Sequence, residues 1–198
     1  MKKLFSVIVA FVICSLPLYA ESSNDDNKKE QEKTEKQLKK EAKAREKALE
    51  AERDSIEFTI MEKAIQEHYF VVTADRIRNK KGYSQVVDPS TNFVLLQGDK
   101  ATVQFALGHG FSGPNGLGGI TVEGKASNIK IDYTKKGNLR FSMMVTGSSI
   151  SAEVSFTLPK NGKHCDATVR SNFNSTNLTF SGNIQPYKKN LYKGRSLP

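Results

Sequence analysis

The sequence predicts a mainly β fold, at the margin of the α+β class. We expect an antiparallel meander of eight to ten strands, forming a curled sheet or a lipocalin-like barrel, preceded by a long N-terminal helix. After Tyr69, apolar residues recur at every second position, which is the period of a strand with one buried face. Turn-forming runs, such as residues 79–82 and 161–162, separate these stretches at short intervals. Such strands share one core, and closure into a barrel protects their edges.

The first twenty residues predict a signal peptide. Lys2 and Lys3 form a positive segment, residues 4–14 are apolar, and residues 16–20 end in a small residue before Glu21. The apolar run is too short to predict a membrane span. We therefore expect secretion across the inner membrane into the periplasm or cell envelope of a Gram-negative bacterium. No transmembrane segment is expected in the mature chain.

Residues 21–54 predict a charged helical spacer. Lys, Glu, Gln, Ala and Arg, all strong helix formers, make up almost all of its sequence from residue 28 onward. Apolar residues are sparse, because only Leu38, Ala42 and Leu49 form a thin stripe without sustained heptads. The pattern favours a solvated tether, and a coiled-coil helix that associates with itself or a partner is the alternative.

Residues 55–198 predict the β-domain, whose first part, residues 55–68, is a helix with one apolar side. Ile56, Ile60, Met61, Ala64 and Ile65 form that side. We expect this side to pack on the strands that follow.

The strands follow in order along the rest of the chain. The first begins at Phe70 and ends at the turn 79–82, and a two-residue hairpin is expected at Gly98-Asp99. Asn161-Gly162 predicts a type I′ turn. The last twelve residues, 187–198, predict an irregular basic extension. The remaining strands are expected at residues 83–87, 93–97, 100–107, 120–123, 129–133, 139–145, 150–158, 165–169 and 178–184.

Positive charge is concentrated in the β-domain. Residues 21–54 carry ten Lys and Arg against eleven Asp and Glu, whereas residues 55–198 carry eighteen against ten. Such a field attracts anionic glycans, lipid headgroups or nucleic acid. The lysines are scattered and no basic motif interleaved with aromatic residues occurs, so nucleic acid is not an expected partner.

Residues 108–119, a glycine-rich segment, form the candidate binding loop. Residues 108–113 match G-x-G-x-x-G, but Pro114 and a strand follow where a dinucleotide site needs a helix, so no cofactor is expected. Loops on rigid sheets often carry recognition, and a wide connection between two strands is the alternative. The candidate binding residues are His109, Phe111, Ser112 and Asn115.

No catalytic or metal-binding residues are predicted. Strand alternation directs Cys165 to the core, while His164 and Asp166 point outward, so this triplet is not expected to act together. The histidines and cysteines show no metal-ligand spacing. A hydrolase that uses outward carboxylates of the strands is the enzymatic alternative, and its candidates are Glu123, Asp132 and Glu153.

Residues 70–195 resemble a secreted bacterial family catalogued as domain of unknown function 4251. The resemblance implies an envelope protein with a mostly antiparallel β fold, and it brings no activity, ligand or catalytic residue. The segments that carry it are FVVTADRIRNKKG (70–82), STNFVLLQGDKATVQFA (90–106), SGPNGLGGITVEGKASNIK (112–130), KKGNLRFSMMV (135–145) and FNSTNLTFSGNIQPYKKNLYKGR (173–195).

The expected function is a non-enzymatic binding or interaction module of the periplasm or cell envelope. Its site would be the barrel mouth or a concave face of the sheet, with the 108–119 loop as a candidate lid. A small molecule, a glycan or an envelope protein are the expected kinds of partner. A structural envelope protein that assembles through its N-terminal helix is the remaining alternative, and the oligomeric state is open.

Overall fold

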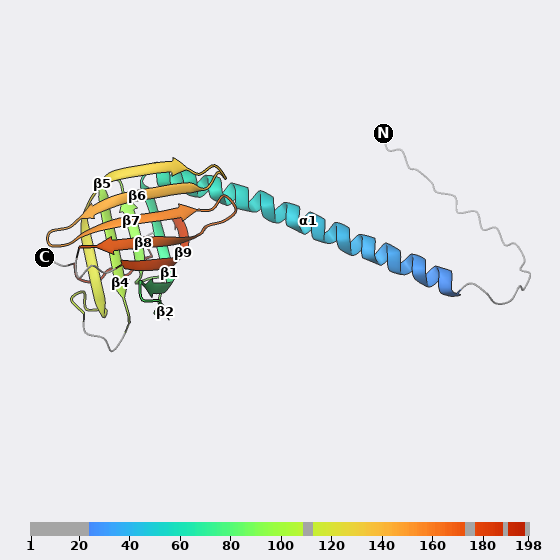
Figure 1. The fold of residues 1–198 in the computed structure, drawn as a ribbon, viewed down its shortest axis with the longest axis horizontal. Helices are drawn as coiled ribbons and strands as arrows, with labels where there is room; N and C mark the ends of the chain where they lie inside the picture. Colours follow the sequence, from blue (N-terminus) through green and yellow to red (C-terminus); the bar gives the residue numbers. More distant parts are fainter. Residues whose placement is uncertain (1–23, 109–112, 173–176, 188–189, 197–198) are drawn as a thin grey trace, which may run out of the picture. The chain divides into compact units, whose positions relative to one another are not determined.

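The structure is a computed structural model of the 198-residue chain, and it describes residues 24–108, 113–172, 177–187 and 190–196. The chain divides into two compact units, 1–45 and 46–198. The first contains the start of helix α1 (Asn24–Gln66), and the second contains the rest of α1 and all described strands (Figure 1). The strands are β1 (Tyr69–Asn79), β2 (Ser84–Val86), β3 (Phe93–Gln97), β4 (Lys100–Ala106), β5 (Gly119–Tyr133), β6 (Leu139–Thr146), β7 (Ser151–Leu158), β8 (His164–Ser171) and β9 (Asn177–Pro186).

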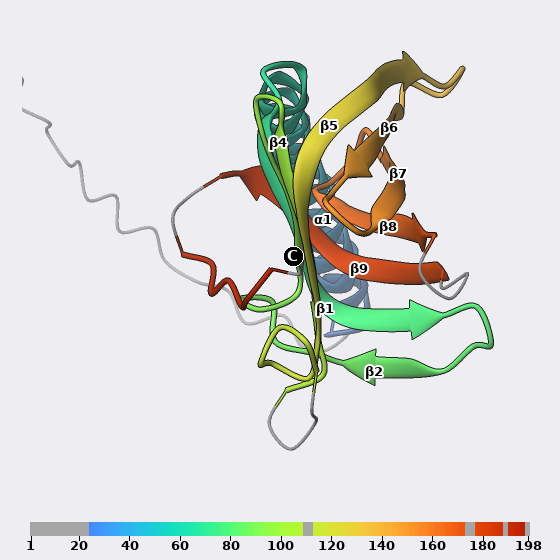
Figure 2. The ribbon, with the colours of Figure 1, turned by 90° about the vertical axis from the view of Figure 1, so that its left-hand side faces the viewer.

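Within the described residues the strands form one antiparallel sheet of nine, and this sheet closes on itself. Its order is β2-β1-β3-β4-β5-β6-β7-β8-β9, and β1 also pairs with β9. The first half of β1 pairs with β3 and its second half with β2. An eight-stranded barrel with one extra strand results, which confirms the predicted lipocalin-like fold. Figure 2 shows the strands curling around the barrel interior.

Strand β5 corrects one detail of the prediction. The stretches 120–123 and 129–133 belong to a single strand of fifteen residues. Its first half pairs with β4 and its second half with β6. The register shifts between Ser127 and Lys130, where Asn128 has a φ of 51°. A β-bulge of this kind bends a strand without ending it, so the polar interruption is a bend, not a turn.

Two predicted turns have different outcomes. Gly98-Asp99 joins β3 to β4 as expected, and Gly98 has a positive φ of 64°. The type I′ turn predicted at Asn161-Gly162 is wrong, because neither residue has a positive φ. Five residues separate β7 from β8, so this longer connection does not need the left-handed backbone of a two-residue turn.

The second half of α1 packs against one end of the barrel. Met61, Ala64 and Ile65 are buried in the core, and Phe58 is partly buried against it. The predicted packing of Ile56 and Ile60 is wrong, because these side chains are 55% and 48% exposed. A helix turns about 100° per residue, so Ile60 lies about 140° around the helix from Ile65. A single contact surface between the helix and the barrel therefore does not bury both Ile60 and Ile65.

Polar contacts hold the same helix segment in place. The Tyr133 hydroxyl at the end of β5 donates a 2.5 Å hydrogen bond to Glu62 and accepts one of 3.3 Å from Gln66. The bond to Glu62 raises the pKa of Tyr133. Lys163, just before β8, forms a 3.4 Å ion pair with Glu57. The end of β5 and the start of β8 therefore mark the barrel end that the helix covers.

Three aromatic rings pack together in the barrel core. Phe70 contacts Phe141 and Phe156 edge to face, with ring centroids 5.1 and 5.7 Å apart. Phe141 and Phe156 stack at 4.9 Å. Such pairs contribute about 0.5–1.5 kcal/mol beyond their buried area.

No helix in the described part of the chain has the length and apolar composition of a membrane span.

The C-terminal segment, of which Tyr187 and residues 190–196 are described, runs along the outer side of the sheet, away from the barrel interior (Figure 2). Like the predicted extension it is irregular, and it is bound to the sheet. Tyr187 and Leu191 pack on a second apolar cluster formed by Val71, Phe93 and Leu95. The positive charge expected of this segment is partly neutralised, because Lys193 forms an ion pair with Glu123 on β5.

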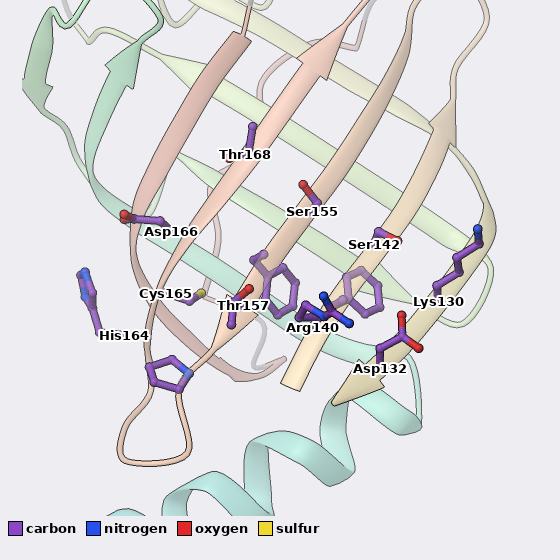
Figure 3. Close-up of a pocket in the computed structure, with 13 residues that line it drawn as sticks. Lys130, Asp132, Arg140, Ser142, Ser155, Thr157, His164, Cys165, Asp166 and Thr168 are labelled. Carbon is purple, nitrogen blue, oxygen red and sulfur yellow. The ribbon is translucent and has the colours of Figure 1, made fainter. Parts of the chain in front are cut away.

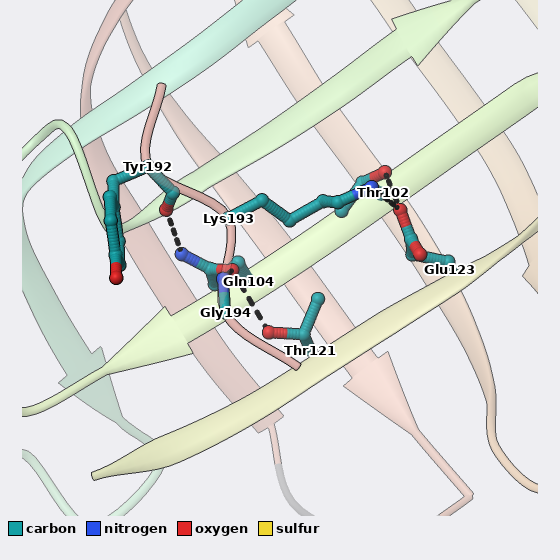
Figure 4. Close-up of polar contacts among 7 residues, drawn as sticks. All are labelled: Thr102, Gln104, Thr121, Glu123, Tyr192, Lys193 and Gly194. Atoms are coloured by element: carbon teal, nitrogen blue, oxygen red, sulfur yellow. Dashed lines mark hydrogen bonds and ion pairs between the residues drawn. The ribbon is translucent and has the colours of Figure 1, made fainter. Parts of the chain in front are cut away.

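Gln104 of β4 fastens the C-terminal segment to the sheet (Figure 4). Its side chain is fully buried, and its Nε2 donates to the carbonyl oxygens of Thr91 and Tyr192 at 2.9 and 2.7 Å. Its Oε1 accepts from the Thr121 hydroxyl at 2.9 Å and from the Gly194 N–H at 2.8 Å. All four hydrogen-bonding positions of this amide are used, so its burial carries no unpaired polar group.

Candidate functional site

The candidate site is an apolar pocket inside the barrel, at the end opposite α1. Its volume is about 290 Å³. The first residues of β5 and the last residues of β4 contribute to it, whereas α1 contacts the last residue of β5. The lining residues are Val103, Phe105, Ile120, Val122, Ile150, Ala152, Val169, Ser171, Leu178 and Phe180.

The strand ends make this pocket accessible. Val103, Val122 and Phe180 are buried deeper in the barrel, while Phe105, Ile120 and Leu178 are only partly buried at its rim. Strand alternation places every second residue of β4 and β5 inside the barrel, so an apolar wall follows from the sequence pattern. Ser171 is the single polar residue among the described lining residues. This composition suits an apolar ligand.

A second hollow continues the apolar rim towards β2. It measures about 360 Å³ and shares Phe105 and Leu178 with the first pocket. It also reaches Ile77 on β1 and Leu107 after β4. Tyr83, which is 74% exposed, also lines it, together with the polar residues Asn79, Ser84 and Gln85. The open barrel end therefore offers apolar surface both inside and beside the pocket.

The glycine-rich loop 108–119 joins β4 to β5 at the open end of the barrel. His109, Phe111 and Ser112, three of the four candidate binding residues, lie outside the described residues. The fourth, Asn115, is 3% exposed. Gly108, Gly116 and Gly118 have positive φ values of 93°, 75° and 79°, a conformation that side chains disfavour.

Asn115 fixes the base of this loop. Its Nδ2 donates to the Phe105 carbonyl at 3.1 Å and to the Thr121 hydroxyl at 3.3 Å. Its Oδ1 accepts from the N–H groups of Leu117 and Gly119 at 2.9 and 3.0 Å. The side chain is fully engaged within the protein, so its hydrogen bonds shape the loop and are not free for a ligand.

A polar groove of about 770 Å³ lies on the outer face of β5 to β8 (Figure 3). Short hydroxyl side chains form its floor, and Ser142, Ser155 and Thr168 are register partners on three adjacent strands. Longer charged side chains lie at its margins. They are Lys130 and Asp132 on the β5 side and His164 and Asp166 on the β8 side, and Arg140 of β6 lies between them beside Thr157. Positive and negative groups balance there, so no single ligand charge is favoured.

The outward carboxylates that sequence reasoning considered are dispersed. Glu123 forms a 2.5 Å ion pair with Lys193 of the C-terminal segment, and Glu153 forms one of 3.5 Å with Arg170. Asp132 lies on the same strand as Glu123, nine residues further along, in the polar groove. Among the described residues, no three His, Cys, Asp or Glu side chains are grouped to hold a metal ion.

The thiol of Cys165 belongs to the core, as strand alternation predicts. It is 3% exposed, and burial, with a smaller contribution from the Asp166 charge, raises its pKa to about 12. His164 and Asp166 are exposed on the other face of β8. Asp166 accepts a 2.5 Å hydrogen bond from Ser181 and pairs with Arg78 at 3.8 Å. A neutral, buried thiol is a poor nucleophile.

Sequence reasoning missed the residues that define the pocket. Phe105, Ile120, Ile150 and Leu178 lie in predicted strands, and alternation cannot distinguish a filled interior from a hollow one. Gln104 was also missed, because a polar residue at an outward strand position ordinarily indicates a solvated face. Three glycines with left-handed backbone near the strand ends were the available signal for this end of the barrel.

Comparisons with known proteins bear on the fold and the family. A comparison with curated proteins finds no match. The solved structure of a DUF4251 family protein from Bacteroides eggerthii DSM 20697 is similar, with a TM-score of 0.60 and 34% sequence identity. The similarity covers 69% of this chain and 91% of that one. The family model for DUF4251, a domain of unknown function, matches residues 52–184. The chain therefore belongs to the DUF4251 family.

Proposed function

We propose that the protein is a binding module that holds a small apolar molecule in the open end of its barrel. The observation that carries the proposal is the pocket of about 290 Å³, lined almost entirely by apolar side chains. Apolar pockets with few polar groups are the usual form of small-molecule sites. An apolar ligand gains about 25 cal/mol for each Å² of surface that it removes from water.

The pocket volume limits the ligand. Ligand pockets usually measure about 300–1,000 Å³, so the pocket of about 290 Å³ lies just below that range. A compact molecule, such as one with one or two rings, fits inside. A longer chain would place one end in the pocket and the rest along the rim at Leu107 and Tyr83.

The loop 108–119 is the proposed lid of this pocket. It joins the ends of the two strands that contribute Phe105 and Ile120 to the lining. His109, Phe111 and Ser112 are the proposed contacts with the ligand, while Asn115 anchors the loop. Double replacement of His109 and Phe111 by alanine should weaken ligand binding without unfolding the barrel, because both residues lie between β4 and β5 in the sequence.

The proposed place of action is the periplasm or cell envelope. The proposal depends on residues 1–20, whose positive start, apolar centre and small final residue are typical of a secretion signal. Fractionation of cells that produce the full chain tests it. The mature chain beginning near Glu21 should be found outside the cytoplasm, and an uncleaved cytoplasmic protein would contradict the proposal.

Native mass spectrometry of the mature chain, purified from the periplasm, tests the binding function. We expect an additional mass that matches a small apolar molecule and disappears on denaturation. The Ala152→Leu variant, which fills the pocket, serves as the matched control and should carry less of this mass. An equal additional mass on both proteins would contradict binding in the pocket.

A further inference from the structure

A second binding site is indicated on the outer face of the barrel, beside the C-terminal segment. A groove of about 720 Å³ lies there, over β3, β4 and the first half of β5. Phe93 and Leu95 on β3, together with Tyr187 and Leu191 of the C-terminal segment, make one part of its wall apolar. The groove is separate from the barrel interior, because outward residues of these strands line it.

The other part of the wall contains two lysines that form no ion pair within the described part of the chain. Lys100 and Lys125 are register partners on β4 and β5, and both are exposed. Neither forms an ion pair with any carboxylate that the structure describes. Asp99 also lines the groove and forms no ion pair with a described residue. Lys193, by contrast, forms an ion pair with Glu123. Like charges directly opposite on adjacent strands are destabilising, and a bound anion would relieve that repulsion.

We infer that this groove binds a small anionic amphiphile. Its carboxylate or phosphate head lies between Lys100 and Lys125, and its apolar body lies against Leu95 and Leu191. The inference follows from the combination of groove, lysine pair and apolar wall, and it is independent of the ligand proposed for the barrel interior. Cationic donors and an apolar wall beside them are the features that orient such a molecule.

The C-terminal segment is part of this site. Leu191 and Tyr187 belong to it, and Gln104 holds the segment on the sheet through Tyr192 and Gly194. Loss of that attachment would remove one wall of the groove. Binding of the amphiphile should therefore protect the segment from proteolysis, because both the sheet and the segment contact the ligand.

Isothermal titration calorimetry of decanoate binding to the full mature chain tests the inference. We expect binding that weakens as salt is added, because the head is held by exposed charges. The double variant Lys100→Gln/Lys125→Gln should bind decanoate about tenfold more weakly. The double variant Lys130→Gln/Lys160→Gln removes two exposed lysines that do not line this groove and should bind it as the wild type does. Equal loss in both variants would overturn the site.

Three further measurements separate this site from other sources of binding. Leu191→Ala should also weaken decanoate binding, and no change there would contradict the assigned apolar wall. Ala152→Leu should leave decanoate binding unchanged; if it abolishes binding, the amphiphile lies in the barrel and the groove assignment fails while the barrel proposal stands. Vesicles with anionic headgroups test a membrane source. If the protein binds these vesicles but not monomeric decanoate, the proposal that the ligand is a free amphiphile is overturned.

Discussion

The side chain of Gln104 and the carbonyl of Tyr192, which are 88 positions apart in the chain, are joined by a 2.7 Å hydrogen bond. This contact ties the C-terminal segment to the outer face of the barrel. The same amide accepts from Thr121, which in turn accepts from Asn115. A continuous set of buried and partly buried hydrogen bonds therefore links the C-terminal segment to the base of the glycine-rich loop.

Replacement of Gln104 by leucine should destabilise the protein by about 3 kcal/mol, because it leaves several buried donors and acceptors unpaired. Urea unfolding of the mature chain measures this change. Gln97→Leu, at an outward, partly exposed position of β3, is the control and should change the free energy of unfolding by less than about 0.5 kcal/mol. Similar values for the two variants would show that the buried network contributes little.

Ile65→Ala should cost about 2–5 kcal/mol, since its side chain is completely buried between α1 and the barrel. Ile60→Ala on the same helix should cost less than about 0.5 kcal/mol, because Ile60 is 48% exposed. Thermal or urea unfolding compares the two directly. A larger loss at Ile60 than at Ile65 would mean that the helix presents the opposite face to the barrel.

Gly182→Ala should destabilise the barrel by about 1–3 kcal/mol. A Cβ added at Gly182 on β9 would overlap the carbonyl oxygen of Thr73 on β1, where the sheet closes. Gly162→Ala is the control, because a Cβ added there meets no atom and its backbone needs no positive φ. Equal stability of the two variants would contradict the close approach of β1 and β9.

Cys165 should make stability fall at alkaline pH. Its folded pKa is raised to about 12, above the unfolded value of 9.0, so the folded state keeps a proton that the unfolded state loses. The contribution of the thiol is complete below pH 9 and is lost as the pH rises towards the folded pKa, at roughly 1.4 kcal/mol per pH unit. Unfolding of Cys165→Ala between pH 8 and 10.5 should show a shallower decline than the wild type. An equally steep decline of stability in both proteins would contradict the raised pKa of Cys165.

The strands could be predicted because alternation is a local property of the sequence. Phe141, Met143 and Val145, for example, alternate with polar or partly exposed neighbours and are all buried in the barrel. The helix face could not be fixed in the same way. Apolar residues occupy two sides of α1 near Ile60 and Ile65, and only the contact with the barrel selects one of them.

The pocket and the C-terminal attachment were beyond sequence reasoning for a different reason. A cavity depends on the summed volumes of side chains from β4, β5, β7, β8 and β9, and no local pattern reports that sum. Gln104 and Tyr192 are likewise brought together only by the tertiary fold. The loop 108–119 was singled out from its glycines, and its strand ends do lie at the rim of the pocket.

The most direct test of the central claim is a titration with N-phenyl-1-naphthylamine, a neutral fluorescent apolar probe, of three proteins. We predict that the wild type binds the probe and that Ala152→Leu binds it about tenfold more weakly. Ala152→Leu should remain as stable as the wild type, whereas Ala167→Leu should be destabilised by about 1–3 kcal/mol. Ala167 is fully buried and does not line the pocket, so leucine there has no space to fill. Unchanged probe binding in Ala152→Leu, or no binding by the wild type, would contradict a ligand site in the barrel.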